Sequence, residues 1–313
     1  MLYFRNISTV LILSLATATL LTAARPADGC TNILVTKGAS ADGSVMITYA
    51  CDGRFHPRLR KREAADHEEG SVFEIRDWSG ELRGVIPQVP HTYAVLGLMN
   101  EHQLAISETT TTGREELQNP DGLLHYWTLM QLALERAKTA REAIEVMTSL
   151  VAEFGYRSTA ESFSIADPNE VWLMEMIGTG PGGDGAVWVA RRIPEGYISA
   201  YANAPRIREF PLDDPENCLH SDNVVSFAVE KGYYDPASGE PFDFANAYDA
   251  PTVQSRRYTA TRVWSIFRRA APSMELDPDY HRGVANAKPY PLWVKPEKQL
   301  TVADVMALMR DHY

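Results

Sequence analysis

The apolar residues near the start of the chain form two short runs separated by turn formers. Ile33-Leu34-Val35 and the run Val45–Tyr49 have the composition of buried strands. Between them, Lys37–Gly43 is rich in turn-forming residues and contains an Asp-Gly pair. A hairpin centred near Ser40 pairs residues whose numbers sum to about 80 to 82. We therefore expect residues 50 to 52 to return beside residue 30.

The rest of the chain alternates between strand-like and helix-like patterns. Apolar residues from Leu123 to Ala137 form one stripe at helical spacing, and those from Ala143 to Phe154 form a second, which begins at a Thr139 cap with Glu142 and ends at Gly155. The other predicted elements are strands at Thr92–Met99, Gln103–Ser107, Ser162–Ala166, Val171–Ile177, Ala186–Ala190 and Tyr197–Tyr201, and helices at Val224–Lys231, Thr259–Ala271 and Val302–His312, the last capped by Thr301. This order suits two sheets packed face to face with helices outside, an α+β fold.

The first 29 residues have the pattern of a secretion signal. Val10–Ala24 is an apolar stretch of about 15 residues, shorter than the roughly 20 that a membrane-spanning helix needs. Ala27 and Gly29 place small side chains three residues and one residue before Cys30, as a signal peptidase requires. A cut after Gly29 is expected, with a cut after Ala24 as the competing site. The protein is therefore expected to be exported, to the periplasm or out of the cell, and residues 30–313 to form its functional domain.

Removal of residues 1–29 would make Cys30 the first residue of the mature protein. A cysteine in that position carries a thiol and a free α-amine, which together can act as nucleophile and general base, because their reference pKa values, about 8.5 and 7.7–8.0, are nearly balanced. Asp52, which returns beside residue 30 in the hairpin, can hold the ammonium group or orient the free amine. Three other interpretations stay open. In the first, the chain is a bacterial lipoprotein with a lipid on Cys30, although Ala27 stands where that signal requires an aliphatic residue. In the second, Cys30 is an ordinary buried thiol. In the third, Asp52 is only a turn residue.

Composition and charge narrow the partners. Removing residues 1–29 takes away Arg5, Arg25 and Asp28 and leaves 28 basic and 40 acidic residues, a formal charge of −12, which repels nucleic acid and anionic lipid. With 45% hydrophobic residues the chain can bury a sizeable core, as one large domain or two small ones, and no later stretch could span a membrane. Three cysteines do not make a disulfide scaffold, but an exported chain could join Cys51 to Cys218. A homo-oligomer stays open.

Other chemistries have less support in the sequence. There is no His-Glu-x-x-His motif, and the eight histidines lack metal-ligand spacing. No Gly-x-Ser-x-Gly elbow is present, which argues against a serine hydrolase of that type. The glycine-rich run Gly180-Pro181-Gly182-Gly183 leads into a predicted strand, whereas a phosphate-binding loop leads into a helix, so it is interpreted as a hairpin loop. The mechanism proposed for Cys30 needs no metal and no organic cofactor.

Several motifs together resemble a known family. Cys30-Thr31-Asn32-Ile33-Leu34-Val35, the turn Ala39–Ser44 and Asp52 are similar to the start of the bacterial dipeptidase A family of N-terminal-nucleophile (Ntn) cysteine hydrolases, relatives of penicillin V acylase and bile-salt hydrolase. The resemblance continues through most of the mature chain, in Leu98-Met99-Asn100-Glu101, Ala105-Ile106-Ser107-Glu108-Thr109, Ala166-Asp167-Pro168 and Trp172-Leu173-Met174-Glu175.

The resemblance implies a four-layer αββα sandwich and hydrolysis of the amide bond of dipeptides. Cys30 matches the nucleophile and Asp52 the acidic residue beside it. Asn203 is similar to the asparagine that lines the oxyanion hole in the acylase relatives, and Arg262 to their arginine near the nucleophile. From the pattern alone, Asn203 is a loop residue and Arg262 lies on the solvent face of a helix. The chain departs from the family at Tyr49, where many relatives carry an arginine, so that arginine's role cannot be transferred.

Three classes of function follow. A dipeptidase is the main prediction, a related amidase acting on N-acyl substrates is the alternative, and a lipid-anchored, non-catalytic envelope protein is the third. The sequence does not distinguish the first two functions, because the substrate pocket is formed by loops whose arrangement cannot be derived from the sequence. Family members commonly run beyond the position of Tyr313, which suggests a shortened member or a fragment that lacks a C-terminal segment.

Overall fold

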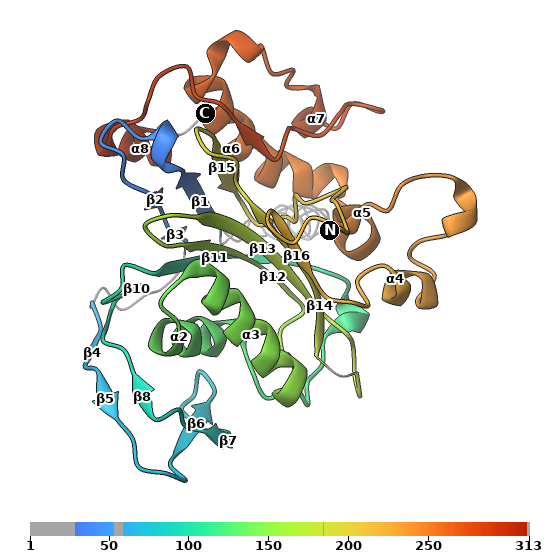
Figure 1. The fold of residues 1–313 in the computed structure, drawn as a ribbon. Helices are drawn as coiled ribbons and strands as arrows, with labels where there is room; N and C mark the ends of the chain where they lie inside the picture. The colour runs from blue at the N-terminus through green and yellow to red at the C-terminus, as the bar shows by residue number, and fades with distance from the viewer. Residues whose placement is uncertain (1–28, 53–58, 184, 312–313) are drawn as a thin grey trace, which may run out of the picture.

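The computed structural model describes residues 29–52, 59–183 and 185–311 (Figure 1). The expected secretion signal lies outside the described residues except for Gly29, as does the predicted end of the last helix at His312. Among the described residues no helix is both long enough and apolar enough to cross a bilayer.

Short strands dominate the first third of the chain and longer ones the middle. The strands are β1 (Cys30–Val35), β2 (Met46–Ile47), β3 (Ala50–Cys51), β4 (Lys61–Arg62), β5 (Ala65–Asp66), β6 (Val72–Arg76), β7 (Leu82–Pro87), β8 (His91–Thr92), β9 (Val95–Leu96), β10 (Met99–Asn100), β11 (Ala105–Thr111), β12 (Ala160–Ala166), β13 (Val171–Gly178), β14 (Ala186–Arg192), β15 (Ile198–Tyr201), β16 (Cys218–His220) and β17 (Trp293–Val294). The helices are α2 (Tyr126–Arg136), α3 (Ala140–Phe154), α4 (Ser226–Glu230), α5 (Phe244–Asp249), α6 (Val253–Ala270), α7 (Asp279–Arg282) and α8 (Val302–Met309). Short 3₁₀ turns are η1 (Lys37–Ala39), η2 (Glu115–Leu117), η3 (Pro236–Ser238) and η4 (Pro272–Met274).

Two antiparallel sheets organise the described residues. One has eight strands in the order β16-β14-β13-β12-β11-β10-β9-β4, and the other has five, in the order β17-β15-β1-β2, with β3 also paired to β1. β5 pairs with β8 and β6 with β7 in two further small sheets. The prediction of an α+β protein is confirmed at the level of a mixed fold with antiparallel sheets.

Alternation along β13 shows how the eight-stranded sheet is buried on both faces. Trp172 and Met174 join an apolar cluster with residues of α2 and α3, whereas Leu173 and Ile177 join a second cluster, which contains Leu34 of the other sheet. Successive side chains of a strand point to opposite faces, so a strand without a polar face must be covered twice. Figure 1 shows α2 and α3 lying along one face of this sheet.

The five-stranded sheet has the same two-sided burial. Leu34 belongs to the cluster shared with the eight-stranded sheet, but its neighbours Ile33 and Val35 pack in a third cluster with Val263 of α6 and Leu308 of α8. Figure 1 shows α6 and α8 on the side of β1 and β15. β1 is therefore held on both faces, which fixes the position of Cys30 at its start.

Several predicted element boundaries are wrong. The predicted strand Thr92–Met99 is divided among β8, β9 and β10, because Gly97 adopts a positive φ of 62° and turns the chain between β9 and β10. α6 begins at Val253, capped by Thr252, rather than at Thr259, since its first turns are polar and hide the apolar stripe. α4 is shorter than the predicted Val224–Lys231.

Other local predictions are confirmed. Thr139 accepts a hydrogen bond from the Glu142 amide at the start of α3, and Gly155, with φ of 76°, ends that helix. Thr301 caps α8 in a reciprocal capping box with Asp304. The chain between β13 and β14 connects two paired antiparallel strands, as expected for the glycine-rich run, which is therefore a hairpin connection.

Candidate active site

The hairpin that follows Cys30 has the predicted register. Leu34 pairs with Ile47 across β1 and β2, and Cys30 pairs with Cys51 across β1 and β3, so paired residue numbers sum to 81. The turn is closed by Asp42, whose carboxylate accepts hydrogen bonds from the hydroxyl groups of Ser40 and Ser44. Local turn chemistry therefore decides which residues return beside Cys30.

Asp52 lies beside the residue that precedes Cys30. The Asp52 amide donates to the Gly29 carbonyl at 2.8 Å. A Cβ built on Gly29 would lie 3.1 Å from Asp52 Oδ2 and 3.2 Å from the Arg262 guanidinium, so only a small residue fits there without displacement. The carboxylate is thus next to the position where the α-amine of a mature Cys30 would begin.

Asn203 reaches Cys30 from the end of β15. The Cys30 backbone N–H donates to Asn203 Oδ1 at 2.6 Å, and Asn203 Nδ2 donates to the Thr110 carbonyl at 2.7 Å. Asn203 has a φ of 58°, a left-handed conformation that asparagine tolerates better than most residues. Its side chain therefore connects the start of β1 with the C-terminal end of β11.

Arg262 of α6 donates hydrogen bonds to the residues around the start of β1. Its Nη1 donates to the Cys30 carbonyl at 2.5 Å and to Thr31 Oγ1 at 3.0 Å, and its Nη2 donates to the Ala202 carbonyl at 3.1 Å and to Asn203 Oδ1 at 2.9 Å. A guanidinium only donates, so it requires the oxygen rather than the nitrogen of Asn203 to face it and Cys30. The helical pattern alone placed this side chain on the solvent face of the helix. In the structure it instead points toward Cys30 and Asn203.

The thiol of Cys30 lies in a buried, acidic environment while Gly29 is attached. Its Sγ is 3.4 Å from Cys51 Sγ. Burial raises the thiol pKa most, the Glu108 carboxylate and Cys51 raise it further, and the Thr110 backbone N–H partly offsets this. An unassisted thiol in this setting is a poor nucleophile at neutral pH, because the thiolate is the reactive form.

The bridge between Cys51 and Cys218 that the sequence left open is not present. All three cysteines lie in the described part of the chain and are free. Cys218 sits on β16 at an edge of the eight-stranded sheet, whereas Cys51 faces Cys30 on β3. The different locations of their strands explain why the pair does not form.

Glu108 and Tyr49 form a contact that the sequence patterns did not predict. The Tyr49 hydroxyl donates to Glu108 Oε1 at 2.5 Å, and Glu108 is 1% exposed. Tyr49, which stands where many relatives carry an arginine, therefore places a hydroxyl rather than a positive charge against this carboxylate. The one available signal was the position of Glu108 directly after the predicted strand Gln103–Ser107, in a segment that resembles the family.

A large cleft opens beside this group. Its volume is about 1280 Å³, and its walls include Thr110, Tyr126 and Glu161 together with Arg60, Arg83 and Arg157. A cleft of this size holds a small peptide readily. It presents both carboxylate and guanidinium groups, which suits a ligand with two opposite charges. No group of three or more His, Cys, Asp or Glu side chains among residues 29–52, 59–183 and 185–311 is arranged to hold a metal ion.

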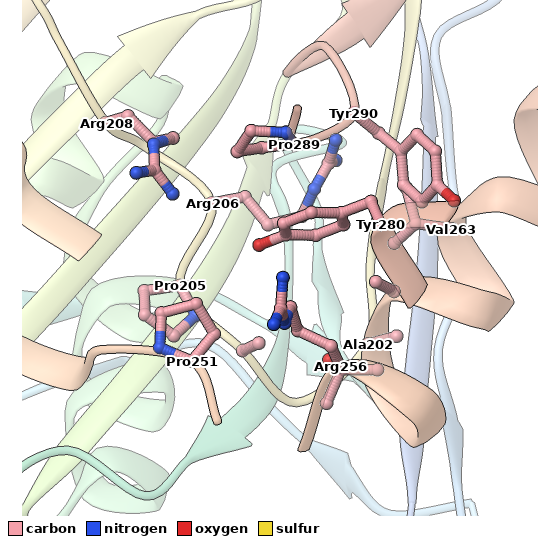
Figure 2. A pocket seen from close by; sticks show the side chains of 13 residues that line it. Ala202, Pro205, Arg206, Arg208, Pro251, Arg256, Val263, Tyr280, Pro289 and Tyr290 are labelled. Carbon is pink, nitrogen blue, oxygen red and sulfur yellow. The ribbon is translucent and has the colours of Figure 1, made fainter. Parts of the chain in front are cut away.

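A second cavity lies on the other side of the Asn203 segment. Figure 2 shows Arg256 against the ring of Tyr280, with the guanidinium carbon 4.9 Å from the ring centroid, and Arg206 beside them. Its volume is about 40 Å³, enough for a few water molecules but not for a dipeptide. Arg206 donates to the Ala200 and Leu292 carbonyls at 2.6 and 3.3 Å, so this guanidinium stabilises backbone.

The structure brings the four predicted site residues together. Cys30, Asn203 and Arg262 are joined by hydrogen bonds, and Asp52 lies beside Gly29. The local hairpin accounts for Cys30 and Asp52, whereas Asn203 and Arg262 come from distant elements. Their chemical roles stay predictions. Glu161 and Tyr126, which line the cleft, and Glu108, which accepts from Tyr49, were not predicted.

Comparisons with known proteins relate this chain to a peptidase family and to proteins named dipeptidase. A model of peptidase family C69 matches residues 29–313. The chain is 27% identical to a protein named probable dipeptidase from Salmonella dublin over 91% of this chain and 66% of that protein. It is 28% identical to a dipeptidase from Bifidobacterium longum and 24% identical to dipeptidase A from Lactobacillus helveticus, over 91% of this chain and 58% and 61% of those proteins. The chain thus spans about three fifths of the length of the curated relatives it matches.

Proposed function

This chain belongs to peptidase family C69, and from that membership and the geometry at Cys30 we propose that it hydrolyses the amide bond of dipeptides, with Cys30 as an N-terminal nucleophile exposed by removal of residues 1–29. The observation that carries the proposal is the hydrogen bond from the Cys30 nitrogen to Asn203 Oδ1, with Asp52 alongside. These acceptors suit an α-amine better than the backbone amide that occupies the position in the uncut chain.

The proposed reaction begins with proton transfer within Cys30. Once Gly29 is removed, the α-amine takes the thiol proton, and the resulting ammonium group is held by Asn203 Oδ1 and the Asp52 carboxylate. An ammonium group a few ångströms from the sulfur offsets the burial that raises the thiol pKa in the uncut chain. The thiolate then attacks the peptide carbonyl of the dipeptide.

The remaining steps use the same groups. The negative charge on the carbonyl oxygen is stabilised by the N–H of Asn203 Nδ2 that Thr110 does not use and by a backbone N–H. The Cys30 ammonium donates its proton to the leaving amine, and water then hydrolyses the thioester. Arg262 is a positioning residue, because it holds the Cys30 carbonyl and Asn203 rather than the substrate.

Two further proposals concern the whole protein. We assign the packing of α2 and α3, the two sheets, and α6 and α8 to the four-layer αββα arrangement of Ntn hydrolases, supported by the three apolar clusters between these elements. We also propose export, which the apolar stretch before Cys30 supports.

The proposal is tested on purified protein whose mature N-terminus is established by mass spectrometry. A panel of dipeptides and of N-acyl amides is assayed with the wild type, with Cys30→Ala, and with Cys218→Ala as the control for loss of a buried cysteine. We expect dipeptide turnover that disappears in Cys30→Ala and persists in Cys218→Ala. A mature chain that begins elsewhere, or dipeptide turnover that survives in Cys30→Ala, would contradict the proposal. Turnover of N-acyl amides alone would replace the dipeptidase by an acylase.

A further inference from the structure

Glu161 is a buried carboxyl group whose contacts with Thr110, Ser162 and Glu108 do not reach standard hydrogen-bond geometry. It is 1% exposed, and neither Oε1 nor Oε2 has a hydrogen bond of standard geometry with any described residue. It belongs to β12, directly opposite Thr110 of β11, and borders the large cleft. Burying such a group without a partner costs several kcal/mol, so natural structures seldom keep one without a use.

A second buried carboxylate accompanies it. Glu108, also 1% exposed, lies on the same strand as Thr110, two residues away. Burial first, and then the neighbouring Glu108, raise the pKa of Glu161 well above its ordinary value. No Lys, Arg or His among the described residues forms an ion pair with either carboxylate. Within the described part of the chain, the pair therefore has no positively charged partner.

The pair lies next to the proposed nucleophile. Glu108 is close enough to raise the pKa of the Cys30 thiol, and the Thr110 backbone contacts both that thiol and Asn203. In a dipeptide, the free α-ammonium nitrogen is two covalent bonds from the scissile carbonyl carbon. When that carbon is at Cys30 Sγ, the ammonium group must occupy the immediate surroundings of the sulfur.

We propose that Glu161, together with Glu108, binds the free α-ammonium group of the substrate's N-terminal residue and so selects unblocked dipeptides over N-acylated ones. This assignment rests on the proposed function and adds the substrate class of the same site. Glu161 is a specificity-determining residue and takes no part in bond making.

The chemistry of the two groups is complementary. An ammonium group has three N–H donors, and Glu161 offers two unused acceptors, with Glu108 Oε2 beside them, engaged only by a 3.4 Å contact from Thr110. A bound cation also supplies the positive partner that these two buried side chains lack, and contacts between charged groups are stronger where the groups are buried. An N-acylated substrate brings one neutral N–H and an extra acyl group, and it leaves the carboxylates unpaired.

The test compares alanyl-alanine with N-acetyl-alanyl-alanine on the full mature protein. Hydrogen bonds to charged groups are worth about 1.5–3 kcal/mol, so Glu161→Gln should lower kcat/KM for alanyl-alanine by about 10- to 100-fold, mainly through KM. Its kcat/KM for the N-acetyl compound should stay within about threefold. Glu108→Gln should act in the same direction, and thermal unfolding verifies that both variants fold. Glu175→Gln, another carboxyl that is 1% exposed but is hydrogen-bonded, is the matched control and should leave the ratio between the two compounds unchanged.

A binding measurement separates this proposal from the proposed function. Calorimetry uses Cys30→Ala protein, which cannot turn over substrate. This variant should bind alanyl-alanine more tightly than its N-acetyl derivative. In the double variant Cys30→Ala, Glu161→Gln, the two compounds should bind equally well. If the wild type hydrolyses neither compound but this binding preference is present, the dipeptidase assignment fails and the ammonium site stands. If both compounds bind equally well with Glu161 intact, or if Glu161→Gln changes both compounds alike, the ammonium site is wrong.

Discussion

Two polar clusters surround Glu161 and Glu175, two buried glutamates that point to opposite faces of the eight-stranded sheet. The open cluster consists of Cys30, Glu108, Thr110, Glu161 and Asn203, and the closed cluster of Glu175, Tyr201, Arg206 and Ile207. Glu161 pairs with Met176 across β12 and β13, so the next residue back along β13, Glu175, points to the other face. Both glutamates are 1% exposed, so burial alone does not distinguish them.

Hydrogen bonding distinguishes them. Glu175 Oε1 accepts from the Tyr201 hydroxyl at 2.6 Å and from the backbone amides of Arg206 at 2.5 Å and Ile207 at 3.0 Å. Burial raises the pKa of Glu175, but these donors limit the rise to about 7. Neither oxygen of Glu161 accepts a hydrogen bond of standard geometry from a described residue, and burial and the neighbouring Glu108 raise its pKa more than the Thr110 side chain and the Ser162 backbone lower it. Glu175 thus has one oxygen, Oε1, held by three donors while Oε2 has none, whereas both oxygens of Glu161 are without one and are available to a ligand.

Keeping Gly29 in front of Cys30 should have the largest effect on the open cluster. The thiol stays in place, but the α-amine becomes an amide that cannot accept a proton, and general base catalysis is typically worth about 10²–10⁴-fold. We expect kcat for dipeptides to fall by that amount relative to protein that begins at Cys30. The measurement is steady-state turnover with the intact mass recorded before and after the assay, since trimming during the assay would restore activity. Full activity with Gly29 still attached would remove the N-terminal-nucleophile mechanism.

Removing the Asn203 side chain should have the next largest effect. Asn203→Ala deletes the acceptor for the Cys30 nitrogen and the proposed oxyanion donor, and loss of one such donor usually lowers kcat by about 10²–10³-fold. Asn286→Ala is the matched control, because Asn286 also has a positive φ, 62° against 58°, and its replacement imposes a similar backbone strain away from Cys30. Near-normal kcat in Asn203→Ala would exclude the side chain from the reaction, and equal loss in both variants would indicate strain alone.

Replacing Glu175 in the closed cluster should have the smallest effect, a change in how the free energy of unfolding depends on pH. The pKa of Glu175 rises from 4.5 to about 7 on folding, so between these values the folded carboxyl keeps a proton that the unfolded chain releases. The wild type should therefore lose stability relative to Glu175→Gln as pH increases from 4.5 to 7, by about 3 kcal/mol over the interval. Urea unfolding of both proteins at pH 5 and pH 8 measures this. A difference in free energy of unfolding that does not change with pH would show that Glu175 titrates alike in both states.

The sequence predicted the part of the site that depends on short-range structure. Turn residues near Ser40 set the hairpin register, and the register brought Asp52 beside Cys30. Asn203 and Arg262 lie 173 and 232 residues from Cys30, and no local pattern connects them to it. They were identified only through the resemblance to a family.

The carboxylates of the open cluster were missed for a different reason. The predicted strands ended at Ser107 and began at Ser162, because the residues beyond them are polar, yet β11 and β12 extend through Glu108 and Glu161. Strand prediction relies on alternating apolar residues, and a functional site interrupts that alternation inside a buried strand. The α+β class could be predicted from the sequence, because the apolar residues of the strands and of the helix pair follow the normal strand and helix spacing.

The long sequence separation of the groups that hold Cys30 also has a consequence for folding. β1 is the first strand of the domain, yet it pairs with β15, and its first residue is held from Asn203 and α6. Contacts between residues so far apart form late, because closing a long loop costs entropy before the contacts stabilise it. A chain still being synthesised carries the thiol without Asn203 and Arg262 to hold it. On the proposed mechanism, the catalytic arrangement around Cys30 therefore forms only when nearly the whole described chain has assembled.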